Sequence, residues 1–87
     1  MDLLTKVRQY QNELQQLGAQ IALYRDLTTN YRLLLEAETE KFKYGESSIF
    51  LINTREQRYL EAQNKYLKLL GEYQKANAGL LWASGTL

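Results

Sequence analysis

One stretch in the middle of the chain decides the fold, and it reads Tyr44-Gly45-Glu46-Ser47-Ser48. Glycine readily adopts the left-handed conformation that closes a helix. Lys41 and Lys43 precede this glycine, where positive charge offsets the negative end of a helix. A serine after it, Ser47 or Ser48, can cap a following helix. The stretch therefore predicts a turn between two helices.

Before the turn, apolar and aromatic residues recur at alternating steps of four and three, which is the spacing of a heptad seam. The positions of this first seam are Leu3, Val7, Tyr10, Leu14, Leu17, Ile21, Tyr24, Thr28, Tyr31, Leu35, Glu38 and Phe42. Several leucines lie off the seam, which indicates contacts with more than one neighbouring helix. The pattern predicts a helix over about residues 2–43, followed by a turn at 44–47.

After the turn, a second seam with the same spacing predicts a helix over about residues 48–83, with Gly85 as a stop signal. Its positions are Ile49, Ile52, Glu56, Tyr59, Gln63, Tyr66, Leu70, Tyr73, Asn77 and Leu80, and Ala62, Leu69 and Ala76 thicken it. Glycines within the helices weaken them unless close packing uses the missing side chain.

Folding the chain at the turn pairs positions whose numbers sum to about 90, and the two seams then meet. The seam residues that come together are Leu17, Tyr24 and Tyr31 with Tyr73, Tyr66 and Tyr59. The sequence therefore predicts an all-α fold: residues 1–87 form one long antiparallel two-helix coiled-coil hairpin, which assembles into a larger helical bundle or barrel.

The composition excludes several classes of function. The 87 residues include 11 Lys and Arg against 10 Asp and Glu, so no bulk charge selects nucleic acid as a partner. The chain has no His and no Cys, and we expect no catalytic residue, metal site or cofactor. The longest purely apolar run, residues 49–52, is far shorter than the roughly 20 residues of a membrane span, and no signal peptide is visible.

Two features do not fit a simple hairpin. Glu38 falls on the first seam, where a charge is costly unless it is paired or wet, so it marks either a watery interior or a lock on the register. The stretch Ser48-Ile49-Phe50-Leu51-Ile52 is apolar on every side of a helix, and one partner helix cannot cover all of it. Another molecule is therefore expected to pack at the tip.

The residues around the turn resemble a known family. The chain from position 37 to 55 reads Ala-Glu-Thr-Glu-Lys-Phe-Lys-Tyr-Gly-Glu-Ser-Ser-Ile-Phe-Leu-Ile-Asn-Thr-Arg, and Tyr59-Leu60-Glu61-Ala62-Gln63 follows. This resembles the second-repeat signature of TolC-type outer-membrane efflux proteins, and the discriminating part is Phe42-x-x-Gly45-x-x-Ser48. The end of the chain, Leu80-Leu81-Trp82-Ala83-Ser84-Gly85-Thr86-Leu87, is similar to the end of the corresponding helix in that family.

The resemblance implies that the chain is one hairpin of a longer trimeric outer-membrane protein, in which such hairpins form a periplasmic α-barrel duct. It also implies that the hairpin tip docks the periplasmic adaptor of a tripartite efflux pump, which contains an inner-membrane pump, or of a type I secretion system. Carried over by position, the adaptor-docking turn is Tyr44, Gly45, Glu46, Ser47 and Ser48. The residues that pack the tip against neighbouring hairpins are Phe42, Ile49, Phe50 and Ile52.

This sequence departs from the family pattern at the tip. Leu51 and Thr54 stand where some members carry aspartates that narrow the periplasmic aperture, so an aspartate gate is not implied. Glu46 follows the glycine where many members have a small or apolar residue, so a preference for one adaptor is not implied either. The alternative interpretation is a generic coiled-coil oligomerisation module, in which the tip is an ordinary loop that tolerates insertion.

Overall fold

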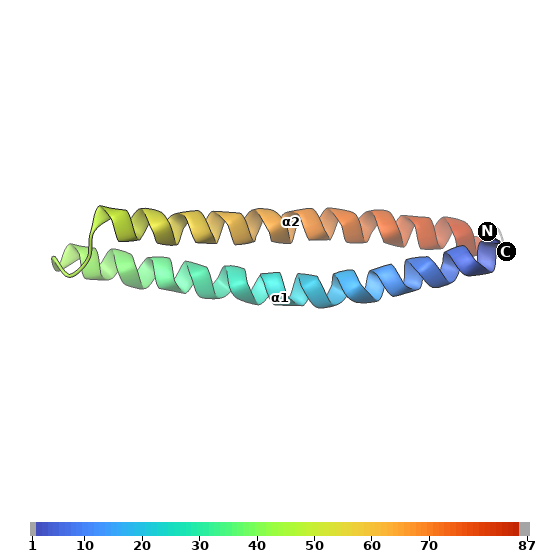
Figure 1. The fold of residues 1–87 in the computed structure, drawn as a ribbon, viewed down its shortest axis with the longest axis horizontal. Coiled ribbons are helices and arrows are strands. Elements are labelled where there is room, and N and C mark those ends of the chain that lie inside the picture. Colours follow the sequence, from blue (N-terminus) through green and yellow to red (C-terminus); the bar gives the residue numbers. More distant parts are fainter. Residues whose placement is uncertain (1, 86–87) are drawn as a thin grey trace. The chain divides into compact units, whose positions relative to one another are not determined.

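The computed structural model describes residues 2–85, and within that range it contains two helices and no strand (Figure 1). Helix α1 spans Leu3–Lys43 and helix α2 spans Ile49–Gly85. The predicted all-α helical hairpin is confirmed. Each helix begins one position later than predicted, and α2 continues past the predicted end at 83 to include Gly85, the last described residue.

The start of α1 has a side-chain cap that the sequence analysis did not identify. The backbone N–H of Thr5 donates a hydrogen bond to Oδ1 of Asp2 at 2.7 Å. This bond satisfies one of the free N–H groups at the helix N-terminus. It also favours the charged carboxylate, and it therefore holds the pKa of Asp2 below its ordinary value.

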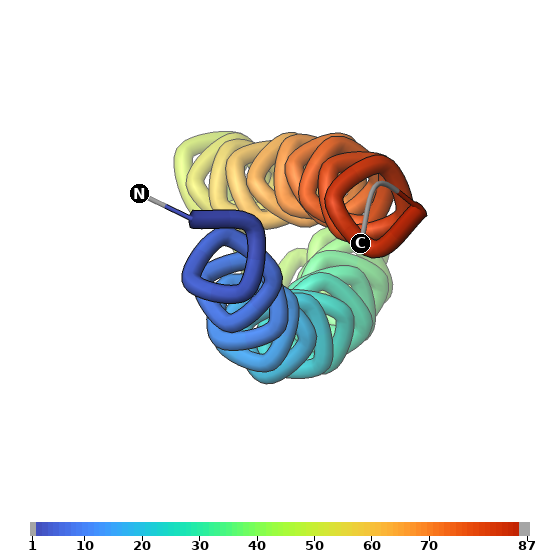
Figure 2. The backbone as a smooth tube through the Cα atoms, turned by 90° about the vertical axis from the view of Figure 1, so that its right-hand side faces the viewer, coloured from blue at the N-terminus to red at the C-terminus, as the bar shows by residue number. Residues whose placement is uncertain are grey.

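The packing of the chain divides into two compact units, each of which contains a segment of both helices. The turn unit comprises residues 23–66, and the end unit comprises residues 1–22 and 67–87, of which 2–22 and 67–85 are described. In the end unit, the first turns of α1 lie beside the last turns of α2 (Figure 2). There the ammonium of Lys6 lies 5.6 Å from the centre of the Trp82 ring, a cation–π contact.

The most deeply buried positions of α2 form a row at intervals of seven residues: Ala62, Leu69, Ala76 and Ala83. In the predicted second seam, Ala62, Leu69 and Ala76 only thickened the pattern, and the main positions were two neighbouring rows, one of which contains Ile49, Glu56 and Asn77. Ile49, Glu56 and Asn77 of that row are exposed, so this part of the prediction is wrong. Three of the four residues in this row are alanines, which let the two helix backbones approach closely, and Leu69 fills the contact between them.

The predicted seam residues therefore lie at different depths. Leu17 is buried, and the half-buried members are Tyr24, Tyr31, Tyr59 and Tyr66. Tyr73 is 37% exposed, so it lies further out than the other five residues of the predicted seam pairs. On α1 the first seam holds from Leu3 to Glu38, all of whose members are half-buried or buried, whereas Phe42 is exposed.

The glycines of α2 differ in what surrounds them. In the end unit, a Cβ at Gly79 would lie 2.6 Å from Cζ of Tyr10, which is too close for any real contact. A Cβ at Gly71 would meet nothing within 4 Å. The Tyr10 ring therefore packs directly on the backbone at Gly79, in the space that a side chain would occupy.

We expect Gly71→Ala to raise the free energy of unfolding by about 0.5–1 kcal/mol, because alanine is the better helix former. Gly79→Ala should raise it by less, because the Tyr10 ring must move away from the new methyl group and part of the gain is lost. Urea unfolding of the variants, followed by circular dichroism, measures both changes. The double variant Tyr10→Leu/Gly79→Ala is the control, because it removes the ring that the new Cβ would meet. If Gly79→Ala alone is as stabilising as Gly71→Ala, the Tyr10 ring does not pack on Gly79.

Candidate functional site at the turn

The backbone around Gly45 forms the turn. Gly45 has a φ of 74°, and no other residue in the described range 2–85 has a positive φ. The N–H of Glu46 donates to the carbonyl of Lys41 at 2.8 Å, and the N–H of Gly45 donates to the carbonyl of Phe42 at 3.0 Å. These two bonds form a Schellman motif, which satisfies the last carbonyls of α1 and ends the helix. The predicted role of Gly45 in closing the helix is therefore confirmed.

The start of α2 is fixed by Ser48 and not by Ser47. The backbone N–H of Leu51 donates to Oγ of Ser48 at 3.2 Å, which is the geometry of an N-cap. The sequence left the choice between the two serines open. The structure assigns the cap to Ser48 and gives Ser47 a different partner.

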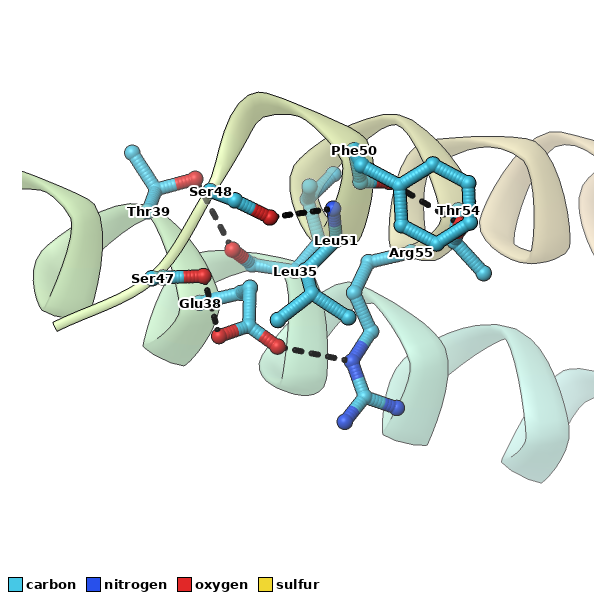
Figure 3. A network of polar contacts seen from close by, with 9 residues as sticks. All are labelled: Leu35, Glu38, Thr39, Ser47, Ser48, Phe50, Leu51, Thr54 and Arg55. Atoms are coloured by element: carbon cyan, nitrogen blue, oxygen red, sulfur yellow. Dashed lines mark hydrogen bonds and ion pairs between the residues drawn. The ribbon is translucent and has the colours of Figure 1, made fainter.

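That partner is Glu38, whose side chain is only 5% exposed although it carries a carboxylate. The hydroxyl of Ser47 donates to Oε2 of Glu38 at 2.7 Å, and Nε of Arg55 donates to Oε1 at 3.3 Å. Figure 3 shows the carboxylate of α1 lying between the turn and the Arg55 side chain of α2. The sequence left open a watery interior or a lock on the register, and a buried carboxylate paired with Arg55 across the two helices favours the lock.

The same contacts determine the protonation of Glu38. The hydrogen bond from Ser47 lowers the pKa of this carboxyl, and burial opposes that effect by disfavouring the charged form. The guanidinium of Arg55 and the ammonium of Lys41 lower the pKa further. The net pKa is below the ordinary value of 4.5, so Glu38 is ionised at neutral pH.

Around this polar contact, large apolar side chains reach the surface. We call them the tip patch, and they are Phe42, Tyr44, Ile49, Phe50 and Leu51. Tyr44 is 77% exposed and Phe50 is 75% exposed, the two highest exposures among the large hydrophobic residues of the described chain. A cluster of exposed apolar side chains beside a well-ordered turn is typical of a protein interaction site.

The structure thus separates the predicted tip residues into exposed and half-buried ones. Tyr44, Gly45, Glu46 and Ser48 are exposed, whereas Ser47 is half-buried and holds Glu38 through its hydroxyl. Phe42, Ile49 and Phe50 belong to the exposed patch, and Ile52 is half-buried. Sequence reasoning assigned no role to Arg55, although its position seven residues before Ala62 places it on the α2 row that faces α1.

The remaining charges near the turn are exposed. Lys43 and Glu40 form an ion pair at 3.0 Å, and both side chains are largely in solvent. Residues 2–85 hold no group of three or more acidic side chains placed to bind a metal ion. In the same range, neither helix is long and apolar enough to cross a membrane.

Comparison with known proteins leaves the family open. No family model, curated protein or solved structure matches this chain.

The conformation of Gly45 provides a direct test of the turn. Gly45→Val should lower the free energy of unfolding by about 1 kcal/mol or more, because a side chain with a branched Cβ is strained at positive φ. The cause is conformational, since a Cβ here would meet nothing within 4 Å. Gly45→Asn is the matched control, because asparagine tolerates the left-handed conformation better. Equal losses for Val and Asn in urea unfolding would contradict this explanation.

Proposed function

We propose that this chain is a periplasmic hairpin of a TolC-type outer-membrane efflux or secretion channel, which forms part of the duct wall and docks the periplasmic adaptor at its tip. The observation that carries the proposal is the tip patch held beside the Gly45 turn. The motif Phe42-x-x-Gly45-x-x-Ser48 supports the family, since each of its residues belongs to the turn or to its immediate surroundings.

The physical reason for docking is the apolar surface that the hairpin leaves uncovered. Burial of one Phe or Ile side chain contributes about 1.5–3 kcal/mol, so a partner that covers several members of the tip patch gains substantial affinity. The Schellman motif, the Ser48 cap and the Glu38 contacts hold the turn in one conformation. A surface that is already ordered loses less conformational entropy when it binds.

A second feature supports assembly of hairpins side by side. In the turn unit, α2 carries an outer stripe at steps of four and three, uncharged and exposed: Asn53, Gln57, Leu60 and Asn64. Helical periodicity puts it on the side away from the buried row at Ala62. The first helix carries an uncharged stripe with the same spacing, in which Leu27 is half-buried and the other members are exposed: Leu23, Leu27, Asn30, Leu34 and Ala37.

Two different stripes on one chain favour a heterologous contact, in which the α2 stripe of one copy packs against the α1 stripe of the next copy. Such contacts close into rings when the rotation is right. The same stripes would also serve a generic coiled-coil oligomerisation module, which is the second candidate function. The tip patch separates the two candidates, because a simple oligomerisation module has no use for apolar side chains around a rigid turn.

To test docking, the double variant Tyr44→Ser/Ile49→Ser is introduced into the full-length protein. Cross-linking to the adaptor and pump-dependent drug resistance should both be lost, while circular dichroism shows that the helices persist. Leu4→Ser is the control, because Leu4 is 54% exposed but lies in the end unit. Unchanged cross-linking and resistance in the tip variant would remove adaptor docking and favour the oligomerisation module.

To test assembly, Leu60→Lys places a charge in the outer stripe of α2. Light scattering should then give a smaller oligomer than for the unaltered chain, because the buried lysine would have no partner. Leu4→Lys is the matched control, since Leu4 is exposed to a similar degree and lies outside both stripes. An unaltered oligomer for Leu60→Lys would rule out this stripe as the contact between copies.

A further inference from the structure

We propose that Glu38 is an acid-sensitive clasp that holds the turn in the conformation presenting the tip patch. The clasp is a property of the hairpin alone. Its consequence for adaptor docking rests on the proposed function, and it would make docking dependent on pH.

The clasp joins three elements through one carboxylate. Glu38 belongs to α1, Ser47 to the turn and Arg55 to α2, and each of the two carboxylate oxygens accepts one hydrogen bond. Glu38 is the buried charged residue of the described chain. Both oxygens of this buried carboxylate have hydrogen-bond partners, as a buried charge requires. The ion pair of Lys43 and Glu40 is exposed, and water can solvate its charges.

Ser47 is the link that matters for the turn. The backbone hydrogen bonds of the Schellman motif reach Glu46, and the backbone bonds of α2 begin with the carbonyl of Ser48. Ser47 lies between these two sets and is tied to α1 by its hydroxyl. The segment that connects the two helix ends therefore depends on the Glu38 carboxylate for its position relative to α1.

Protonation would change the clasp in a definite way. A protonated oxygen becomes a donor, so it no longer accepts from both Ser47 and Arg55, and the ion pair with Arg55 is lost. The charged groups acting on Glu38 are Lys41 on α1 and Arg55 on α2, both positive, and the turn contributes the neutral hydroxyl of Ser47. All three favour the ionised carboxylate, so the clasp is closed at neutral pH.

The sign of the pH dependence follows from the lowered pKa of Glu38. A carboxyl whose pKa is lower in the folded state stabilises the fold fully above its unfolded value, and that contribution is lost as the pH falls through the folded value. The clasp should therefore open only below about pH 4.5, the ordinary value for a glutamate. Opening would release Ser47, and with it the neighbouring Tyr44 and Ile49 side chains of the tip patch.

The first experiment is an NMR titration of the carboxyl carbon of Glu38 and the amide of Ser47. We expect Glu38 to titrate below its ordinary pKa and the Ser47 amide to shift with the same midpoint. Ser47→Ala should raise that midpoint, because the Ser47 hydrogen bond is the largest influence on it. An ordinary or raised midpoint for Glu38, or a midpoint that Ser47→Ala leaves in place, would overturn the clasp.

The second experiment removes the charge at neutral pH. In Glu38→Gln, hydrogen-exchange protection of the amides at 46–52 should fall about tenfold or more, while protection in the end unit is kept. Glu40→Gln is the control, since Glu40 is an exposed carboxylate on the same helix and its loss should leave protection at the turn unchanged. Equal protection in Glu38→Gln and the unaltered chain would also overturn the clasp.

Adaptor cross-linking with full-length Glu38→Gln then separates the clasp from the proposed function. Reduced cross-linking, together with a clasp that titrates as expected, supports both. Intact docking in Glu38→Gln despite a loosened turn overturns control of docking by the clasp. If the clasp titrates as expected but neither Glu38→Gln nor the tip-patch variant affects cross-linking, the proposed docking function fails and the clasp remains.

Discussion

The structure depends on one backbone conformation, the positive φ of Gly45. At 74° this residue lies in a region that side chains with a Cβ rarely adopt, and the Schellman hydrogen bonds need a residue in that conformation. Without it, the heptad pattern before the turn would continue into the apolar residues after it, because both segments have strong helical periodicity. The reversal brings the buried faces of the two helices against one another, and it places the most apolar segment at the apex, where α1 does not cover it.

The packing of the helices shows which part of a coiled-coil hairpin can be predicted from sequence. The seam on α1 follows directly from the spacing of its large residues, and the structure keeps that row from Leu3 to Glu38. On α2 two parallel rows satisfy the same periodicity, and prediction favoured the row containing Glu56 and Asn77. The buried row is instead Ala62, Leu69, Ala76 and Ala83. The buried row is the more uniformly apolar of the two, but alanine is a weak signal in a pattern read from large side chains, because its advantage comes from how closely it lets the helices approach.

The site was predicted in outline and not in its connections. The apolar stretch after the turn already indicated that the tip lacks cover, and the charge of Glu38 on the seam already indicated an unusual contact. Ser47 and Arg55 are nine and 17 residues away in the chain, and the path of the turn brings them to Glu38. The heptad spacing to Ala62 places Arg55 on the side facing α1, but no pattern in the sequence pairs Ser47 with Glu38. Likewise, two adjacent serines have the same capping ability, and the direction of each side chain decides which one caps α2.

An exposed apolar patch adds nothing to the stability of an isolated hairpin and a buried ion pair adds little, yet the two features lie at the same turn. A buried ion pair is a weak source of stability, but it discriminates strongly between arrangements, because any shift of Arg55 or Ser47 leaves the Glu38 carboxylate unpaired. An exposed patch is useful to a partner only if its side chains keep a fixed arrangement. The two features are therefore complementary: Glu38 restricts the turn to one conformation, and that restriction gives Phe42, Tyr44 and Phe50 a defined surface for another molecule to recognise.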